Sequence, residues 1–390
     1  MPDFWQFSSP TKVMFGKGLS IDFAVELEAL GITSALLISD ANLGKSGLLK
    51  PVADSIRENG IKVIGPFTDV PANSSLSAVK ACADFAVKNN ADGIIALGGG
   101  SVLDTAKAAN ILISHGGDLA KDYSGAQTIP GPLKPLIAIP TTAGTGSEVT
   151  QAAVILDTER GTKLSFYDQY LHPSIAILDP LLLKDIPPSL MAATGWDAFT
   201  HAIEAYTSLQ SNPFSDELAL PAVRLIKEAF IPAVTEPKNL DAKGQMLLAA
   251  TLAGIAFDQA MVGVVHAMAH ACGGLSRAHH GTLNFILLPH GMEYNMPVAL
   301  EKYATLAKVL HVNPKLKKKK KLAHLSVKVI RKWQKKLHKV CNLPLKLRDV
   351  GIARDNLGLI AKKACEDGTS FYNPREVEET EILKTLERAW

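Results

Sequence analysis

Short apolar segments alternate with amphipathic helical segments along the first half of this chain. Residues 34–40, 61–67 and 92–101 have the length and apolar character of buried strands, while residues 48–60 and 76–90 show the spacing of helices. Strands and helices that alternate in this way are typical of a parallel sheet covered by helices. The first half is therefore predicted to adopt an α/β fold.

The second half follows a different pattern. After about residue 185 strand-like runs largely disappear, and alanine-rich helical windows such as residues 246–257 follow one another. The turn DIPPSL at residues 185–190 marks the change, and 390 residues are more than one compact domain usually holds. We expect two domains, an α/β domain at residues 1–186 and an all-helical domain at residues 187–390.

The overall composition argues against several classes of protein. Hydrophobic residues make up 47%, charged residues 20%, and the net charge is +3, so nothing global points to nucleic acid or an acidic membrane surface. The four cysteines show no CxxC spacing, and the N-terminus lacks the basic-then-apolar pattern of a signal peptide. These features predict a reduced, cytoplasmic protein with neither nucleic acid nor membrane as a partner.

One segment is unusually basic. Residues 313–324 hold six lysines, five of them consecutive at residues 317–321. Such a run can bind nucleic acid or acidic lipid, or it can be a solvated helix start or loop. We favour the solvated segment, because no aromatic residues interleave with the lysines to stack on bases.

Two glycine-rich loops indicate a bound phosphate. Residues 94–110 read as a buried strand, the sequence GGGS and an alanine-rich helix, and residues 139–150, IPTTAGTGSEVT, follow another apolar run. Glycines let the backbone approach a ligand closely, and the start of a helix attracts anions. Neither loop has GxGxxG or ATP-loop spacing. Both would lie at the carboxyl ends of parallel strands, where open α/β sheets bind ligands, so we expect a phosphate-bearing cofactor.

Asp40 ends one of the predicted strands. An acidic residue at this position can hold the ribose hydroxyls of a dinucleotide and disfavour a 2′-phosphate. It can equally cap the turn or helix that follows. The residues alone leave both roles open.

Histidines and a carboxylate gather in the helical half. Asp197 and His201 are spaced i, i+4 and so share a helix face. Four of the eleven histidines fall within fifteen residues, namely His266, His270, His279 and His280. One carboxylate with several imidazoles is typical of a first-row divalent metal site. A Ser-His-Asp hydrolase is disfavoured, because the chain has no GxSxG elbow.

Six segments spread along nearly the whole chain match the signatures of one family, in the family's order: FGKG (15–18), GGGSVLDTAK (98–107), IPTTAGTGSE (139–148), GWDAFTHAIEAY (195–206), VHAMAHACGG (265–274) and LLPHGMEYN (287–295). On these segments the chain resembles the iron-containing, or group III, alcohol dehydrogenases. The resemblance implies a dinucleotide-binding α/β domain, here residues 1–186, and an all-helical metal-binding domain, here residues 187–390. It also implies a homodimer or a larger homo-oligomer.

The resemblance assigns a metal site and a proton carrier. It implies that the divalent metal, Fe²⁺ foremost and Zn²⁺ second, is bound by Asp197, His201, His266 and His280. Where the family commonly has a proline before the last ligand this chain has His279, but the following glycine and the spacing from His266 favour His280. His270 matches the family histidine that relays a proton near the substrate. His290 is expected to be structural.

The resemblance also assigns a site for NAD. It implies that the pyrophosphate is held by the GGGS loop, Gly98, Gly99, Gly100 and Ser101. It implies that the adenine and nicotinamide neighbourhood is lined by Thr141, Thr142, Thr145 and Ser147. Asp104 and Lys107 match the motif, and for Asp104 a place in the active site and a structural role are both open. Asp40 becomes a candidate for choosing NAD over NADP.

The expected activity is that of a metal-dependent alcohol dehydrogenase and aldehyde reductase that transfers hydride between a short primary alcohol or diol and NAD(H). The alternatives are a relative of the dehydroquinate synthases or of the glycerol dehydrogenases, which use NAD and zinc, and a non-catalytic binding protein. The mostly small and aromatic stretch at residues 195–208 disfavours a dehydroquinate-synthase-like pocket, and an intact ligand set disfavours a binding protein. The sequence does not identify which alcohol or aldehyde is the substrate.

Overall fold

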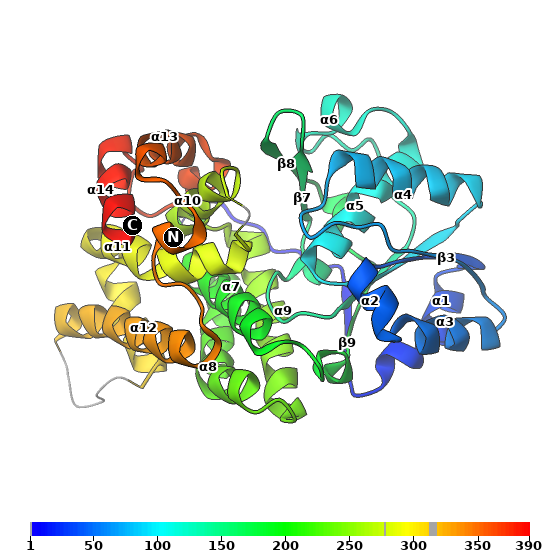
Figure 1. Ribbon diagram of the computed structural model, residues 1–390, viewed down its shortest axis with the longest axis horizontal. Helices are drawn as coiled ribbons and strands as arrows, with labels where there is room; N and C mark the ends of the chain where they lie inside the picture. Colours follow the sequence, from blue (N-terminus) through cyan, green and yellow to red (C-terminus); the bar gives the residue numbers. More distant parts are fainter. Residues whose placement is uncertain (1, 277, 312–317) are drawn as a thin grey trace. The chain divides into compact units, whose positions relative to one another are not determined.

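The computed structural model describes residues 2–276, 278–311 and 318–390 (Figure 1). The chain divides into two compact units, one formed by Ser9–Asp185 and the other by Met1–Ser8 together with Ile186–Trp390. A sheet with helices makes up the first unit and helices make up the second, which confirms the predicted fold class.

The N-terminal segment groups with the helical unit, whereas the prediction places it in the α/β domain. Gln259 Oε1 accepts the Ser8 backbone N–H at 3.0 Å, and Gln259 Nε2 donates to the Ser8 carbonyl at 2.8 Å. The ring of Phe7 stacks on Phe214 with centroids 5.0 Å apart. These partners lie more than two hundred residues away along the chain, so no local pattern could reveal them.

Six strands form the main sheet of the Ser9–Asp185 unit, in the order β1-β9-β6-β4-β2-β3, and every neighbouring pair is parallel. The strands are β1 (Lys12–Phe15), β2 (Ser34–Ile38), β3 (Lys62–Phe67), β4 (Gly93–Gly98), β6 (Leu136–Pro140) and β9 (Ile175–Leu178). The central strands β4 and β6 are buried at every residue, which explains why their sequences are continuous apolar runs.

The order of the strands reverses between β2 and β4. From β2 the chain moves outward to β3, returns to β4 on the other side of β2, and continues to β6 and β9. Open α/β sheets bind ligands at such a point, beyond the carboxyl ends of the two strands. Asp40 follows β2 and the GGGS sequence follows β4, so the two predicted cofactor elements flank this point.

Helices connect these strands. They are α1 (Ala24–Ala29), α2 (Ala41–Ser46), α3 (Leu49–Glu58), α4 (Leu76–Lys88), α5 (Gly100–His115) and α6 (Leu119–Asp122). The stretches predicted as helices are α3 and α4, each slightly shorter than expected. Ser75 begins α4 by accepting the Ala78 N–H on its Oγ at 3.3 Å. Short 3-10 helices also occur in this unit, at Leu19–Ile21, Ser147–Val149, Gln169–Leu171 and Pro180–Leu183.

A second, three-stranded sheet was not predicted. It has the order β5-β8-β7, with β5 (Gly125–Ala126) parallel to β8 (Thr162–Tyr167) and β8 antiparallel to β7 (Ala152–Asp157). Asp157 shapes the turn of the hairpin, because its Oδ1 accepts the backbone N–H groups of Glu159 and Arg160.

Helices account for the second unit, and no strand occurs in residues 186–276, 278–311 and 318–390. The helices are α7 (Pro188–Thr207), α8 (Pro213–Thr235), α9 (Leu240–Ala260), α10 (Val264–Gly273), α11 (His280–Val309), α12 (Lys319–Cys341), α13 (Leu357–Glu366) and α14 (Glu379–Ala389) (Figure 1). Shorter 3-10 helices lie at Leu347–Val350, Arg354–Asn356 and Gly368–Tyr372.

Helix α7 forms the centre of the helical unit, since every residue from Met191 to Thr207 is buried. Neighbouring helices approach it closely. A Cβ at Gly195 would lie 2.5 Å from the Phe230 ring and 2.8 Å from Met246 Cε, so only glycine fits there. Polar side chains on α7 are consequently enclosed by protein rather than by water.

The basic segment falls partly outside the described residues, because Asn313–Lys317 are not among them. Its described part, Lys318–Lys321, is exposed at the start of α12, as expected for a solvated helix start.

In the described part of the chain no single helix is both long enough and apolar enough to cross a membrane. Helices α9 and α10 satisfy the length and the composition only when they are taken together, and the chain bends by 101° between them.

Candidate metal centre and nucleotide site

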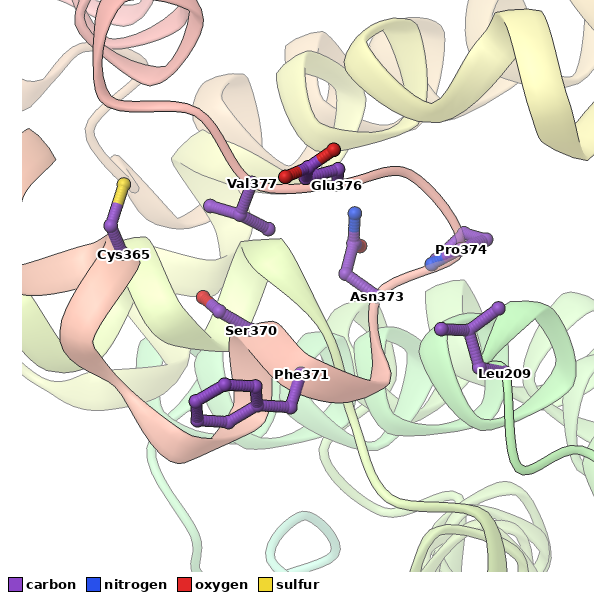
Figure 2. A pocket seen from close by; sticks show the side chains of 8 residues that line it. All are labelled: Leu209, Cys365, Ser370, Phe371, Asn373, Pro374, Glu376 and Val377. Atoms are coloured by element: carbon purple, nitrogen blue, oxygen red, sulfur yellow. The ribbon is translucent and has the colours of Figure 1, made fainter.

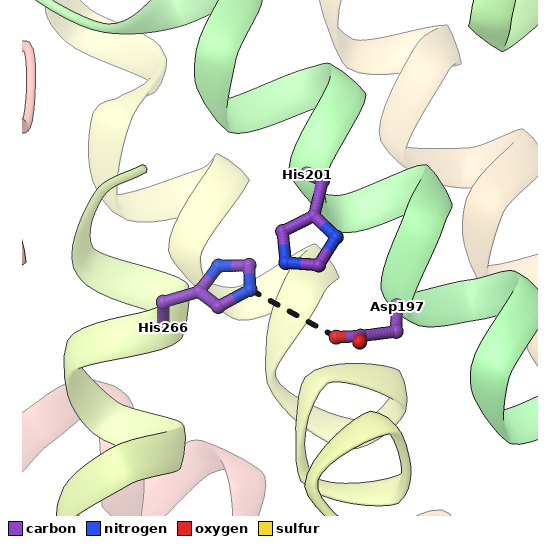
Figure 3. Close-up of side chains that lie close together, drawn as sticks. All are labelled: Asp197, His201 and His266. Atoms are coloured by element: carbon purple, nitrogen blue, oxygen red, sulfur yellow. Dashed lines mark ion pairs between the residues drawn. The ribbon is translucent and has the colours of Figure 1, made fainter. Parts of the chain in front are cut away.

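Three predicted metal ligands meet in the interior of the helical unit. Helix α7 carries Asp197 and His201 on one face, and α10 carries His266. Each residue offers one ligand atom, these atoms all lie within 4.8 Å of one another, and the three residues are only 2%, 6% and 2% exposed. Figure 3 shows the three side chains turned toward one another, with His266 Nε2 3.8 Å from Asp197 Oδ1.

Aromatic rings lie against both imidazoles. The His201 ring stacks on Phe257 at 4.3 Å and on the His266 ring at 4.6 Å. Two protonated imidazoles stacked this closely would repel each other, and a buried carboxylate without a cation beside it is costly. A divalent cation held by neutral imidazoles and one carboxylate resolves both difficulties, so the donor set fits a first-row metal.

His280 approaches the same place from the first residue of α11. Its Nε2 lies 3.6 Å from Asp197 Oδ1, and its side chain is 27% exposed. It is not one of the three residues whose ligand atoms lie within 4.8 Å of one another. His279 precedes the helix as its exposed N-cap.

Asn284, which the sequence analysis did not single out, lies among the ligand atoms. Its Nδ2 is 2.7 Å from Asp197 Oδ1 and 3.1 Å from the Nε2 atoms of both His266 and His280. An amide nitrogen has two hydrogens and cannot donate to three acceptors at once. Three acceptors that converge on one point are satisfied better by a cation, which supports the fit of a metal here.

Gly281 allows α11 to approach α7 at the metal centre. A Cβ at this position would lie 2.2 Å from the Ala193 carbonyl oxygen and 3.4 Å from Asp197 Cβ.

We predict that Gly281→Ala forces the helices apart, displaces His280 and lowers the free energy of unfolding by about 1–3 kcal/mol. Denaturant unfolding of the metal-free protein tests this, with Gly358→Ala, where a Cβ meets nothing within 4 Å, as the control. Equal destabilisation by both substitutions would contradict the prediction.

Glu204 is a second residue that the sequence analysis missed. Its Oε2 lies 2.6 Å from His266 Nδ1, and its Oε1 accepts the Val265 backbone N–H at 2.7 Å. A signal for it was present, because Glu204 stands on the same face of α7 as Asp197 and His201, at spacings i+7 and i+3.

His270, the predicted proton carrier, pairs with Asp367. His270 Nδ1 lies 3.0 Å from Asp367 Oδ2, and Asp367 Oδ1 also accepts from the Thr369 N–H and hydroxyl. Burial raises the pKa of Asp367, but the His270 ring and Thr369 outweigh burial and hold the pKa at about 2. The ionised carboxylate only accepts, so Nδ1 of His270 carries the hydrogen. The ring stacks on His280 with centroids 5.3 Å apart.

The two glycine-rich loops of the α/β unit lie against each other. The Thr141 backbone N–H donates to the Gly98 carbonyl at 3.0 Å. A Cβ at Gly100 would lie 2.6 Å from Thr145 Cγ2, and a Cβ at Gly99 would lie 3.4 Å from Thr142. Gly99 is the N-cap of α5 and makes no side-chain cap bond, so the first N–H groups of the helix suit a phosphate.

Several predicted cofactor residues also form hydrogen bonds between segments of the α/β unit. Ser101 Oγ donates to the Ala72 carbonyl. Ser147 Oγ donates to Asp104 Oδ1 at 2.7 Å, and the Val154 N–H donates to Asp104 Oδ2 at 3.1 Å. Burial raises the pKa of Asp104. Asp104 therefore joins α5 to the second loop and to β7.

Lys107 is fully buried, and its Nζ donates to the carbonyls of Thr150 and Ala152 at 2.7 and 2.9 Å.

Asp40 caps α2, because its Oδ1 accepts the N–H groups of Asn42 and Leu43. Both of these bonds end on the same oxygen of Asp40, so the cap uses one side of the carboxylate. Capping is one of the two roles that the sequence left open for Asp40.

A cavity of about 380 Å³ lies elsewhere in the helical unit (Figure 2). It is lined by Leu209, Cys365, Ser370, Phe371, Asn373, Pro374, Glu376 and Val377. None of these is a predicted metal or cofactor residue. Phe371 is 77% exposed at its rim, and the pKa of Cys365 is raised by burial and by Glu379 and Glu366.

Comparison with known proteins shows that both units match models of the same protein family. The family model described as iron-containing alcohol dehydrogenase matches residues 10–180, and the model for the C-terminal part of the Fe-containing alcohol dehydrogenase family matches residues 191–390. The chain is 37% identical to 1,3-propanediol dehydrogenase of Citrobacter freundii, over 98% of this chain and 97% of that one. It is 33% identical to NAD-dependent methanol dehydrogenase of Bacillus methanolicus, over 98% and 99%.

Solved structures agree with these sequence matches. A crystal structure of 1,3-propanediol oxidoreductase superposes with a TM-score of 0.95 at 36% identity, covering 99% of this chain and all of the other. The alcohol dehydrogenase from Oenococcus oeni superposes with a TM-score of 0.94 at 35% identity, with the same coverage.

Proposed function

Because this chain belongs to the iron-containing alcohol dehydrogenase family, we propose that it interconverts a short primary alcohol or diol and its aldehyde with NAD(H) as the hydride carrier. The observation that carries the proposal is the buried group of Asp197, His201 and His266. The relatives named for methanol and 1,3-propanediol support this class of substrate over a dehydroquinate-synthase-like or glycerol-dehydrogenase-like reaction.

The metal site of the proposal consists of Asp197, His201, His266 and His280. One carboxylate and three imidazoles suit Fe²⁺, and Zn²⁺ accepts the same ligands. The family favours iron. The acceptor atoms of Asp197, His266 and His280 all lie within 3.1 Å of Asn284 Nδ2, and this closeness supports a shared ion.

When bound, a divalent metal lowers the pKa of an alcohol hydroxyl and NAD⁺ accepts the hydride from its carbon. The residues of this chain supply binding, orientation and proton transfer. His270 directs its Nδ1–H at Asp367, so its Nε2 is the atom that can accept the hydroxyl proton and return it in aldehyde reduction. Asp367 thereby fixes the ring of the proton carrier.

The nucleotide site of the proposal lies at the reversal of strand order. The pyrophosphate is held at the start of α5 by Gly98, Gly99, Gly100 and Ser101. The adenine and nicotinamide neighbourhood is lined by residues of the second loop, Thr141, Thr142, Thr145 and Ser147. Asp104 holds that loop in place through Ser147. The carboxylate of Asp40 binds the adenosine ribose and disfavours a 2′-phosphate, which favours NAD over NADP.

Asp40→Ser tests this assignment without removing the helix cap, because serine also caps helices well. We expect kcat/KM with NADP to rise and kcat/KM with NAD to fall. Their ratio should shift about tenfold or more toward NADP, because a hydrogen bond to a charged group contributes about 1.5–3 kcal/mol and about 1.4 kcal/mol corresponds to a factor of ten. The melting temperature should change little. An unchanged ratio of the two kcat/KM values would show that Asp40 serves only as a cap.

We also propose that the enzyme works in the cytoplasm as a homodimer or larger homo-oligomer. All four cysteines are free, which suits a reducing compartment. Light scattering of the purified protein tests the oligomeric state.

Metal removal and restoration test the proposed activity. NADH appearance at 340 nm is followed with short alcohols and diols on protein stripped by a chelator and then reloaded anaerobically with Fe²⁺ or Zn²⁺. We expect activity to vanish on stripping and to return with iron. Failure of every alcohol and aldehyde, with both NAD and NADP and with the metal loaded, would contradict the proposed function.

A further inference from the structure

Glu204 is a buried carboxylate that the predicted ligand set does not use. It lies on α7 and is 4% exposed. In residues 2–276, 278–311 and 318–390 no lysine or arginine forms an ion pair with it, and the titratable side chain that it contacts is the ring of His266. Because a buried carboxylate without partners is costly, its contacts with α10 are the reason it is tolerated there.

Three donors from the start of α10 converge on this carboxylate. The Val265 N–H donates to Oε1 at 2.7 Å, the His266 N–H donates to Oε2 at 3.3 Å, and His266 Nδ1 lies 2.6 Å from Oε2. Backbone N–H groups can only donate, so both carboxylate oxygens act as acceptors. The hydrogen of the shortest contact therefore belongs to Nδ1 of the His266 ring.

The hydrogen on Nδ1 determines the state of the other ring nitrogen, Nε2. With the hydrogen on Nδ1, a neutral imidazole presents a lone pair at Nε2. His266 Nε2 is the atom that lies 3.8 Å from Asp197 Oδ1 and 3.1 Å from Asn284 Nδ2, at the point where the ligand atoms converge.

Gly263 allows Glu204 to reach the start of the helix. A Cβ at Gly263 would lie 3.2 Å from Glu204 Oε1 and 2.8 Å from Asn373 Oδ1. Asn373 Oδ1 accepts the Val264 N–H at 3.1 Å. Two side chains thus cap α10. Asn373 Oδ1 bonds the backbone of the helix and the Asn295 amide, whereas Glu204 bonds the backbone of the helix and the His266 imidazole.

We propose that Glu204 is a positioning residue of the metal centre, which holds the His266 ring in the Nδ1–H tautomer and aims its Nε2 lone pair at the metal. The inference rests on the proposed function. A carboxylate on the far nitrogen fixes the orientation of a ligating histidine and increases its basicity. Glu204 also adds a second negative charge to that of Asp197, and together the two carboxylates balance the charge of a divalent ion.

Glu204→Gln in the whole 390-residue chain tests the inference, because glutamine keeps the volume but removes the charge. The Co²⁺-loaded protein is mixed with excess chelator, and the rate of metal release is followed by the visible absorption of Co²⁺. We expect release about 10–100-fold faster than in the unmodified protein, the usual cost of losing such a partner, and a change in the visible bands.

Asn373→Ala is the matched control, because it loosens the same end of α10 without touching the imidazole. We expect it to lower the melting temperature while leaving the Co²⁺ spectrum and the release rate unchanged. Equal release rates in the two variants would overturn the inference, because Glu204 would then act only as a helix cap.

A measurement on the unmodified protein covers the case in which Glu204→Gln does not fold. Nitrogen-15 NMR of histidine-labelled, Zn²⁺-loaded protein should show a bonded hydrogen on His266 Nδ1 and a metal-shifted Nε2. Ligation through Nδ1 would overturn the inference. An unmodified protein that takes up no divalent metal would instead refute the proposed function itself, whereas tight uptake with equal release from Glu204→Gln would refute only the role of Glu204.

Discussion

Replacing Asp197 with asparagine is expected to lower kcat/KM for the alcohol by about a thousandfold or more, because a Lewis acid contributes several kcal/mol to the transition state and ~4 kcal/mol corresponds to a factor of about 10³. Asp197 is the only carboxylate among the proposed ligands, and its Oδ1 lies 3.8 Å from His266 Nε2 and 3.6 Å from His280 Nε2. Asparagine keeps the shape but loses the charge that holds a divalent ion. Iron content and NADH formation, measured on the same preparation, test the prediction.

The same substitution is expected to have the opposite effect on the stability of the metal-free protein. Asp197 is 2% exposed, and without a cation its charge is buried among imidazoles. Asparagine can still accept the bond from Asn284 Nδ2 without this cost, so metal-free Asp197→Asn should be at least as stable as the metal-free parent. Saturating metal should then stabilise only the parent, by about 2.7 kcal/mol at one hundred times Kd.

Asp216→Asn is the control for both measurements. Asp216 lies at the start of α8, pairs with Lys302 at 3.7 Å and, within the described residues, forms no ion pair with the proposed ligands. It should keep its iron and its activity. Full iron content and normal kcat/KM in Asp197→Asn would remove Asp197 from the metal site.

Part of the main sheet and the longer helices were predictable because each leaves a local pattern in the sequence, whereas the four-residue strands β1 and β9 were not predicted. β4 is fully buried and therefore reads as an unbroken apolar run, and α4 reads with helical spacing. The hairpin of β7 and β8 was missed because β7, AAVILD, is apolar at five consecutive residues, so its sequence does not reveal that only every second residue is buried. The burial of β8, TKLSFY, follows no regular alternation, and the two strands depend on pairing with each other. The place of Ser8 depends on Gln259, so it follows from tertiary packing alone.

In the candidate site, too, some residues were predictable from local spacing and others depend on contacts between distant parts of the chain. The i, i+4 spacing brings Asp197 and His201 onto one face, and the same rule applied one turn further would have found Glu204. Asn284 stands four residues after His280 and could have been found likewise. Asp367 could not, because nothing local links it to His270, its partner almost one hundred residues earlier.

Lowering the pH from 7 to 5 is expected to destabilise the protein by about 2 kcal/mol through His290 alone. Burial, followed by Arg331, Arg388 and Lys346, lowers the pKa of His290 from 6.5 to about 3. Its ring is 7% exposed and lines a cavity of about 190 Å³ with these three cations. The charged form is therefore disfavoured in the folded state.

The sign follows from the protons bound by each state. Between pH 3 and 6.5 the unfolded chain binds a proton at His290 and the folded protein does not, so the free energy of unfolding rises with pH in this range and falls as the pH is lowered. His290→Asn removes the group that titrates. Its free energy of unfolding should therefore fall about 2 kcal/mol less than that of the parent between pH 7 and 5. Denaturant unfolding of the metal-free proteins measures the difference, and His324→Asn, at an exposed position on α12, should behave like the parent. Parallel pH profiles for the parent and His290→Asn would show that His290 is already protonated in the folded protein, and that an anion or a solvent path in the cavity offsets the three cations.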